Sequence, residues 1–164
     1  MWYNSWMDRI DRKILALLQD DASLPVAGIA ERVGLSPTPC WRRIQKLESD
    51  GFILKRVALP SPEKLNVGVT VFVLIKTSQH DRAWFERFKA LVLKIPEVVE
   101  FHRLSGQADY LFWVVVSDIA GYDAVYQELI HNTQLFDVSS SFAMETIKLT
   151  TALPLHHVAE RRTA

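Results

Sequence analysis

The stretch from Ser36 to Gly51, SPTPCWRRIQKLESDG, constrains the chain most, because it predicts a helix with two unlike faces. Ser36 is a favourable N-cap, Pro37 suits the first helical turn, and Gly51 suits the position just past the end. At about 100° per residue, one narrow stripe of this helix is apolar: Cys40, Ile44 and Leu47. The opposite side carries side chains that form hydrogen bonds: Thr38, Arg42, Gln45, Lys46 and Ser49.

A helix with an apolar back and an Arg/Gln/Lys front fits the major groove of DNA. The alternative is a solvated surface helix, and the helix by itself leaves the two interpretations near even. The preceding residues favour DNA. Val26 to Val33 has helical spacing, and Gly34 serves a tight turn before the second helix. A helix, a short turn with glycine and a helix with a basic face are typical of a helix-turn-helix motif.

The residues on either side extend this motif to a small domain. Asp8 is a favourable N-cap for an earlier helix with apolar residues at helical spacing. The apolar run Phe52–Leu59 predicts a strand, the start of a wing, with Lys55 and Arg56 placed for phosphate contacts. We therefore expect a winged helix-turn-helix domain over residues 1–60.

Charge supports DNA binding only locally. The formal net charge of the chain is zero, so the overall charge does not point to nucleic acid. Between Ser36 and Arg56, however, five residues are basic and two are acidic, which is compatible with DNA binding but weaker evidence than a basic domain. No apolar run approaches the roughly 18 residues of a membrane span, and the N-terminus lacks a signal-peptide pattern. We expect a cytoplasmic protein that does not enter a membrane.

The pattern changes beyond residue 60. Four β-branched and apolar runs predict strands: Val69–Ile75, Val98–Leu104, Tyr110–Val116 and Val138–Leu149. Two amphipathic runs predict helices between them: Asp81–Ile95 and Asp118–Ile130. The order β-α-β-β-α-β is the ferredoxin-like arrangement, which we assign to residues 61–164. The predicted fold class is α+β, with a winged helix-turn-helix domain followed by this second domain.

Two of these strands predict a dimer. Val69–Ile75 and Tyr110–Val116 are apolar at odd and even positions alike, whereas a strand buried on one face should alternate. Continuous apolarity means that both faces are covered. Two helices cover one face only, so the other face needs a partner, most simply the same sheet of a second subunit. We expect a homodimer with its sheets packed face to face.

Nearly the whole chain resembles the Lrp/AsnC family of bacterial feast/famine transcription regulators. The resemblance rests on motifs that are specific in combination: Met7-Asp8-Arg9-Ile10-Asp11, Leu35-Ser36-Pro37-Thr38-Pro39-Cys40-Trp41, Leu47-Glu48…Gly51-Phe52-Ile53, Gly106-x-x-Asp109-Tyr110 and Met144-Glu145-x-Ile147-Lys148. It implies dimers, often assembled into tetramers or octamers, and an amino-acid effector bound between subunits. The chain looks closest to a subfamily that includes regulators of amino-acid catabolism, cysteine catabolism among them, which makes cysteine the first guess for the effector.

The candidate contacts to double-stranded DNA lie in and after the second helix of the motif: Ser36, Thr38, Pro39, Trp41, Arg42, Arg43, Gln45, Lys46 and Lys55. Two of them flank the polar face and carry open alternatives. Trp41 either packs on the wing or reaches the groove. Arg43 either pairs within the domain or holds a phosphate.

The candidate effector contacts come from the family motif and from a serine run in the last strand: Gly106, Gln107, Asp109, Tyr110, Ser140 and Ser141. Gly106 allows close backbone approach, and Asp109 can accept a hydrogen bond from a ligand ammonium group. The serine hydroxyls can donate to a carboxylate. Without the resemblance, a plain hairpin turn at Gly106–Asp109 is the favoured interpretation.

No other motif points to chemistry. Cys40 lies on the buried stripe, so we interpret it as a core residue. His156 and His157 have no Cys or acidic cluster beside them, so we expect solvated side chains and no metal. A nucleophile-base pair and a Gly-rich phosphate loop are missing, so we expect no catalysis and no cofactor besides the effector. The alternative is an amino-acid-binding allosteric subunit or an enzyme of amino-acid metabolism, which leaves the basic helix face unexplained.

Overall fold

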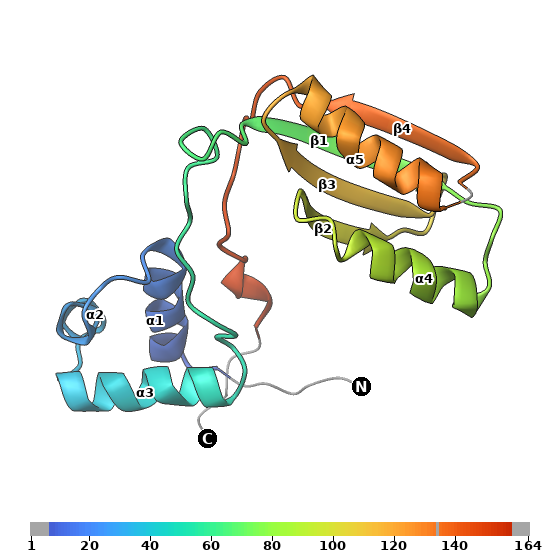
Figure 1. The fold of residues 1–164 in the computed structure, drawn as a ribbon. Coiled ribbons are helices and arrows are strands. Elements are labelled where there is room, and N and C mark those ends of the chain that lie inside the picture. Colours follow the sequence, from blue (N-terminus) through green and yellow to red (C-terminus); the bar gives the residue numbers. More distant parts are fainter. Residues whose placement is uncertain (1–6, 134, 159–164) are drawn as a thin grey trace. The chain divides into compact units, whose positions relative to one another are not determined.

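The computed structural model describes residues 7–133 and 135–158 and divides the chain into two compact units (Figure 1). The first unit takes in the chain up to Leu59 together with the segment from Lys148 onward, and the second runs from Pro60 to Ile147. The predicted assignment of residues 61–164 to one domain therefore differs from the observed contacts in one point. The chain after Ile147 packs with the first unit.

Three helices form the first unit: α1 (Arg9–Asp20), α2 (Val26–Val33) and α3 (Pro37–Ser49). Asp8 caps α1 as predicted, since one carboxylate oxygen accepts the amides of Ile10 and Asp11 at 2.8 Å each. Gly34 ends α2 in the left-handed region, with φ at 74°, which makes the turn to α3 easy for glycine. The apolar stripes of the helices form the core of this unit: Met7, Ile14, Leu15, Leu18, Ile29, Ala30, Val33, Cys40, Ile44 and Leu47.

The predicted strand Phe52–Leu59 is wrong. The amides of Phe52 and Ile53 both donate to the Leu47 carbonyl at the end of α3, and the chain then runs on to Leu59 without forming a strand. Leu54 is 90% exposed. A strand needs a neighbour to accept its backbone hydrogen bonds, and the described part of the first unit contains no strand. The apolar side chains of this segment therefore have no sheet to join.

A second difference is that the C-terminal segment completes the first unit. The Gln19 side chain donates to the Leu153 carbonyl at 3.2 Å and accepts from the Leu153 amide at 2.8 Å. Arg12 Nη2 donates to the Val158 carbonyl at 2.8 Å. Between these bonds lies the 3-10 helix η1 (Leu155–His157), whose leucine packs against the helical core, as does Val158. The Arg12 and Gln19 side chains of α1 thus hold the C-terminal segment by hydrogen bonds to its backbone.

The second unit has the predicted order β-α-β-β-α-β. Its elements are β1 (Val69–Lys76), α4 (Arg82–Val92), β2 (Val98–Arg103), β3 (Tyr110–Val116), α5 (Ile119–Asn132) and β4 (Asp137–Phe142). The four strands form one antiparallel sheet in the order β2-β3-β1-β4. The last predicted strand, Val138–Leu149, is too long. Phe142 already pairs with Val71, so β1 offers almost no further backbone to extend β4.

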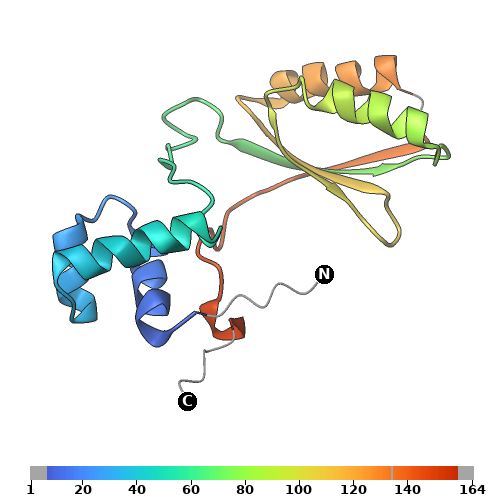
Figure 2. The same ribbon diagram turned by 90° about the horizontal axis from the view of Figure 1, so that it is seen from below.

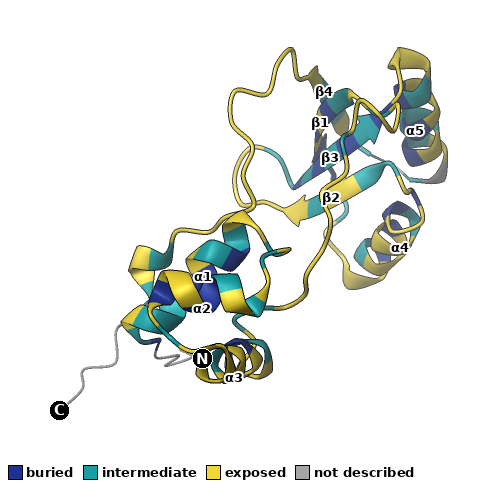
Figure 3. Ribbon diagram, turned by 90° about the vertical axis from the view of Figure 1, so that its left-hand side faces the viewer, coloured by how far each residue is buried: buried dark blue, intermediate teal, exposed yellow. Residues whose placement is uncertain are grey.

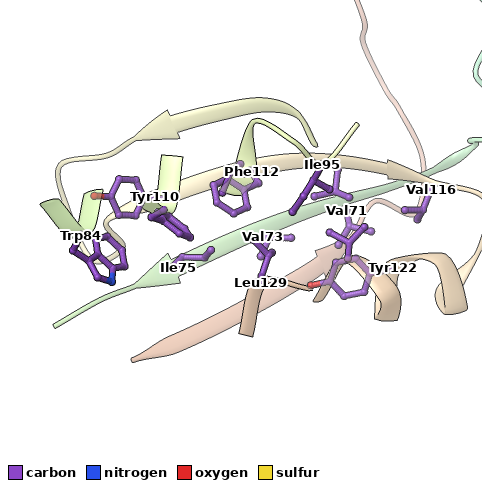
Figure 4. Packing of buried hydrophobic residues seen from close by; sticks show 14 residues of the cluster. Val71, Val73, Ile75, Trp84, Ile95, Tyr110, Phe112, Val116, Tyr122 and Leu129 are labelled. Atoms are coloured by element: carbon purple, nitrogen blue, oxygen red, sulfur yellow. The ribbon is translucent and has the colours of Figure 1, made fainter. Parts of the chain in front are cut away.

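Both helices of this unit lie on one face of the sheet (Figures 1 and 2). Val73 of β1 and Phe112 of β3 are fully buried beneath them (Figure 4). The Phe88 ring of α4 packs against the rings of Trp84 and Phe112. On the opposite face, Phe72 and Leu74 are 41% and 39% exposed. The expectation of strands that are apolar on both sides, with helices over one side, is confirmed. Within the described residues, no helix combines the length and apolarity of a membrane span.

Candidate nucleic-acid interface and effector site

Helix α3 buries one stripe and exposes the other, as its sequence predicts (Figure 3). Cys40 and Ile44 are at most 1% exposed. All of the hydrogen-bonding residues of the predicted DNA face are exposed: Thr38, Arg42, Gln45, Lys46 and Ser49. Ser36 and Pro39 are exposed at the start of the helix, and Trp41 is 51% exposed. The structure thus presents a polar helix face on a rigid apolar support.

The exposed face is not uniform along α3. In the N-terminal half, neither the Thr38 side chain nor the Arg42 side chain forms a hydrogen bond or ion pair with another described residue. In the C-terminal half, Gln45 Nε2 donates to a Glu48 carboxylate oxygen at 2.9 Å, and Lys46 pairs with Asp50 one turn later. The free donors therefore lie in the half of a recognition helix that usually meets the base edges.

Arg43 faces into the unit. One of its guanidinium nitrogens lies 2.5 Å from an Asp8 oxygen and 2.7 Å from an Asp11 oxygen, so it joins α3 to the start of α1. These hydrogen bonds to Asp11 and Asp8 raise the pKa of Arg43. Partial burial raises the pKa of Asp8, but the bonds from the Asp11 amide and Arg43 outweigh it and leave that pKa lowered. The geometry supports the alternative in which Arg43 pairs within the domain.

Lys55 lies on the exposed segment that follows α3. Its neighbour Arg56 is held near the helix, because Arg56 Nη2 donates to the second Glu48 oxygen at 2.8 Å. No local sequence pattern indicates this contact, since the basic and acidic residues are eight positions apart.

The turn between β2 and β3 carries the predicted effector motif. Gly106 has φ at 152°, a region that favours glycine, and Gln107 is exposed. One carboxylate oxygen of Asp109 accepts the Thr77 amide at 2.8 Å, and the Asp109 amide donates to the Ile75 carbonyl at 2.9 Å. Asp109 therefore ties the turn to the end of β1, which is a structural task within the sheet.

Tyr110 points to the helix-covered side and stacks against Phe85 with ring centroids 6.0 Å apart. Burial raises the pKa of its hydroxyl. Tyr110 lines a hollow of about 180 Å³ together with Gln79, His80, Asp81, Arg82, Phe85 and Arg103. This lining includes one carboxylate, Asp81, and two guanidinium groups, Arg82 and Arg103. Such a lining can meet both ends of a small zwitterion.

The two serines face opposite sides of β4. The Ser140 hydroxyl is hydrogen-bonded to the Tyr122 hydroxyl on the helix side, and Ser141 pairs with Phe72 of β1. Burial is the main influence on the Tyr122 hydroxyl and raises its pKa. β1 lies between β4 and β3. The serines on β4 are therefore two strand spacings, about 10 Å, from β3, the strand that carries Tyr110. One protomer therefore does not bring the two predicted groups into one pocket.

Two family models match the chain. Residues 7–53 match a model described as winged helix-turn-helix DNA-binding, and residues 70–153 match the Lrp/AsnC ligand binding domain. Within the described residues, no cluster of three or more His, Cys, Asp or Glu side chains could hold a metal ion.

Known proteins resemble the chain over nearly its whole length. The DNA-binding transcriptional activator DecR of Escherichia coli (strain K12) is 50% identical over 150 residues, which are 91% of this chain and 99% of DecR. An AsnC family transcriptional regulator from Agrobacterium tumefaciens has a crystal structure with 60% identity and a TM-score of 0.87, covering 91% of this chain and 97% of that chain. The structure of the transcriptional regulator NMB0573 of Neisseria meningitidis, a complex with L-Met, has 37% identity and a TM-score of 0.88, covering 93% and 99%.

Proposed function

The chain belongs to the Lrp/AsnC family of DNA-binding transcriptional regulators, and from this premise we propose that α3 enters the major groove of double-stranded DNA under the control of an amino acid. One observation carries the proposal. The N-terminal half of α3 presents Thr38 and Arg42 to solvent above a fully buried apolar stripe. An arginine placed there can bond guanine through two atoms, and Gln45 can bond adenine in the same way. Lys55, just past the helix, reaches a phosphate.

Arg42→Ala is expected to weaken binding to the preferred DNA site by about 1–3 kcal/mol and to relax its sequence preference. Lys55→Ala is expected to weaken binding to every sequence alike and to flatten the dependence of log K on log salt by about 0.9. The measurement is fluorescence anisotropy on the site that the wild-type protein selects from a random DNA pool, with a shuffled site beside it.

Lys13→Ala serves as the control, because this exposed lysine lies on α1, away from the predicted face. It should bind both DNA sites as the wild type does. Wild-type affinity of Arg42→Ala for the selected site, with sequence preference kept, is the outcome that overturns the assignment of this face.

We further propose that two chains pair through the uncovered face of the sheet. Phe72 and Leu74 on β1 lie in register with Trp113 and Leu111 on β3, so the apolar side chains form a continuous patch. A two-fold pair of chains carries two recognition helices and therefore favours a roughly palindromic DNA site. We also propose that such dimers assemble into tetramers or octamers. The protein is proposed to act in the cytoplasm, where the DNA that it binds lies.

The proposed effector site lies at the turn Gly106–Tyr110, at or near the contact between subunits. Asp109 has one carboxylate oxygen on the Thr77 amide, and we propose that the other accepts the ligand ammonium group. Backbone amides beside Gly106 donate to the ligand carboxylate. Ser140 and Ser141 enter this site only if another subunit supplies them, because β1 separates them from the turn. Cysteine is the first candidate, and methionine is the second because the Neisseria neighbour is a complex with L-Met.

Asp109→Asn is expected to weaken the response to the amino acid and to leave DNA binding by the unliganded protein unchanged. Asparagine keeps an acceptor for the Thr77 amide but loses the charge that pairs with an ammonium group. A thermal-shift screen of the twenty amino acids first identifies the ligand from the wild-type protein, and the variant is then titrated with it. We expect at least a tenfold higher concentration for half-response, because a hydrogen bond to a charged group contributes about 1.5–3 kcal/mol.

Asp123→Asn is the matched control, since it removes a carboxylate from an exposed position on α5 of the same unit. It should respond at the wild-type concentration. An unchanged response in Asp109→Asn means that the ligand binds elsewhere and that the turn is only a hairpin.

The competing proposal is an enzyme or an allosteric subunit of amino-acid metabolism. The relatives and solved neighbours described above carry regulator names. The exposed basic face of α3 has no use in such an enzyme. We therefore propose that the chain acts by binding DNA and catalyses no reaction.

A further inference from the structure

The Glu48 carboxylate accepts hydrogen bonds from two side chains, one within α3 and one in the segment that follows the helix. One oxygen accepts Gln45 Nε2 from within α3 at 2.9 Å, and the other accepts Arg56 Nη2 from the segment after the helix at 2.8 Å. The Glu48 and Arg56 side chains are 34% and 42% exposed. An ion pair so exposed contributes little to folding stability. The main effect of Glu48 is therefore on what the Gln45 and Arg56 side chains can contact.

Each partner has a different use at a DNA surface. Gln45 can bond adenine through two atoms only when its amide oxygen and nitrogen are correctly oriented. Because the Glu48 carboxylate can only accept, its bond to Gln45 fixes the orientation of this amide group. Arg56 is a cation that contacts phosphates of any sequence. Glu48 neutralises it and holds it against the end of α3.

We propose that Glu48 is a positioning residue that raises sequence specificity without touching DNA itself. It acts twice: it orients the Gln45 amide for base contact, and it withholds Arg56 from non-specific phosphate contact. The inference rests on the proposed function, because it takes α3 as the recognition helix. An acidic residue on a DNA-binding face would by its charge alone only repel DNA. In this proposal Glu48 instead favours binding to the correct sequence.

Glu48→Ala is expected to bind shuffled DNA more tightly, with a salt dependence of log K that is steeper by about 0.9 because one more phosphate is contacted. The ratio of affinities for the selected and shuffled sites should fall about tenfold, within the range of one bidentate base contact. The measurement is anisotropy at four salt concentrations on both DNA sites. Glu48→Gln, which keeps the shape and an acceptor oxygen, should show the steeper slope with a smaller loss of ratio.

Two control variants separate this role from simpler ones. Glu31→Ala removes an exposed carboxylate from α2 of the same unit, so it reports the effect of one negative charge at a distance. The double variant Glu48→Ala with Arg56→Ala should return the slope to the wild-type value, since the released cation is gone.

The outcomes are distinct. If the wild-type protein selects no site, or Arg42→Ala keeps full specificity, the proposed function itself fails. If the wild-type protein selects a site and Arg42→Ala loses specificity, but the Glu48 variants keep the wild-type affinity ratio and salt slope, the positioning role is overturned. A parallel loss of affinity for both DNA sites with a lower melting temperature overturns it too, because that result marks a merely structural residue.

Discussion

Leu74→Glu is expected to convert the protein into monomers and to weaken binding to the selected DNA site about a hundredfold, since linked binding of two modules is lost. Leu74 lies on the uncovered face of the sheet, in register with Leu111 of β3 and Ser139 of β4. In a face-to-face dimer a glutamate there is buried against the apolar patch of the partner sheet, and burying a charge is strongly unfavourable. Sedimentation equilibrium at micromolar concentration measures the assembly, and anisotropy measures the affinity.

Leu93→Glu is the matched control. Leu93 is 70% exposed and follows α4 on the helix-covered side of the same unit, so its replacement adds the same charge away from the patch. It should remain dimeric with wild-type DNA binding. A Leu74→Glu protein that is folded, dimeric and tightly bound to DNA contradicts the sheet-on-sheet interface.

Ending the chain after Ala152 is expected to destabilise the helical unit by about 2–4 kcal/mol, through lost burial of Leu155 and Val158 and three lost hydrogen bonds. Hydrogen-deuterium exchange of the full-length and shortened proteins measures the effect. Peptides from α1 should exchange faster in the shortened protein. Peptides from β1 and β3 belong to the other unit and act as the internal control.

Gln19→Ala tests the same contact without shortening the chain. It removes both bonds to the Leu153 backbone and should increase α1 exchange to a smaller degree. Unchanged α1 exchange in the shortened protein contradicts the view that the C-terminal segment completes the DNA-binding unit.

The helices were predictable because their signals are local. Asp8 marks a helix start through its side-chain carboxylate, and Gly34 marks a helix end through its left-handed backbone. The stripe through Ile44 follows from helical spacing alone. The strand Phe52–Leu59 was predicted wrongly for the opposite reason. Its side chains favour a sheet, but a strand forms only where a second strand accepts its hydrogen bonds, and no local pattern reports that absence.

The C-terminal segment and the serines show the same limit. Gln19 and Leu153 are far apart in the chain, and a polar side chain that pairs with a backbone leaves no periodic trace. Three successive serines, Ser139 to Ser141, give no alternation from which to tell the faces of β4 apart. Only the register with β1 places Ser140 against Tyr122 on the helix side.

The most direct measurement for the account as a whole is an anisotropy titration of the wild-type protein on its selected DNA site, repeated with each of the twenty amino acids. We expect tight binding to that site and weak binding to the shuffled site. We also expect one amino acid to change the affinity about 5- to 150-fold, the usual range of allosteric coupling. Curves that superimpose for selected and shuffled DNA, or that no amino acid moves, contradict a ligand-responsive regulator that reads DNA through α3.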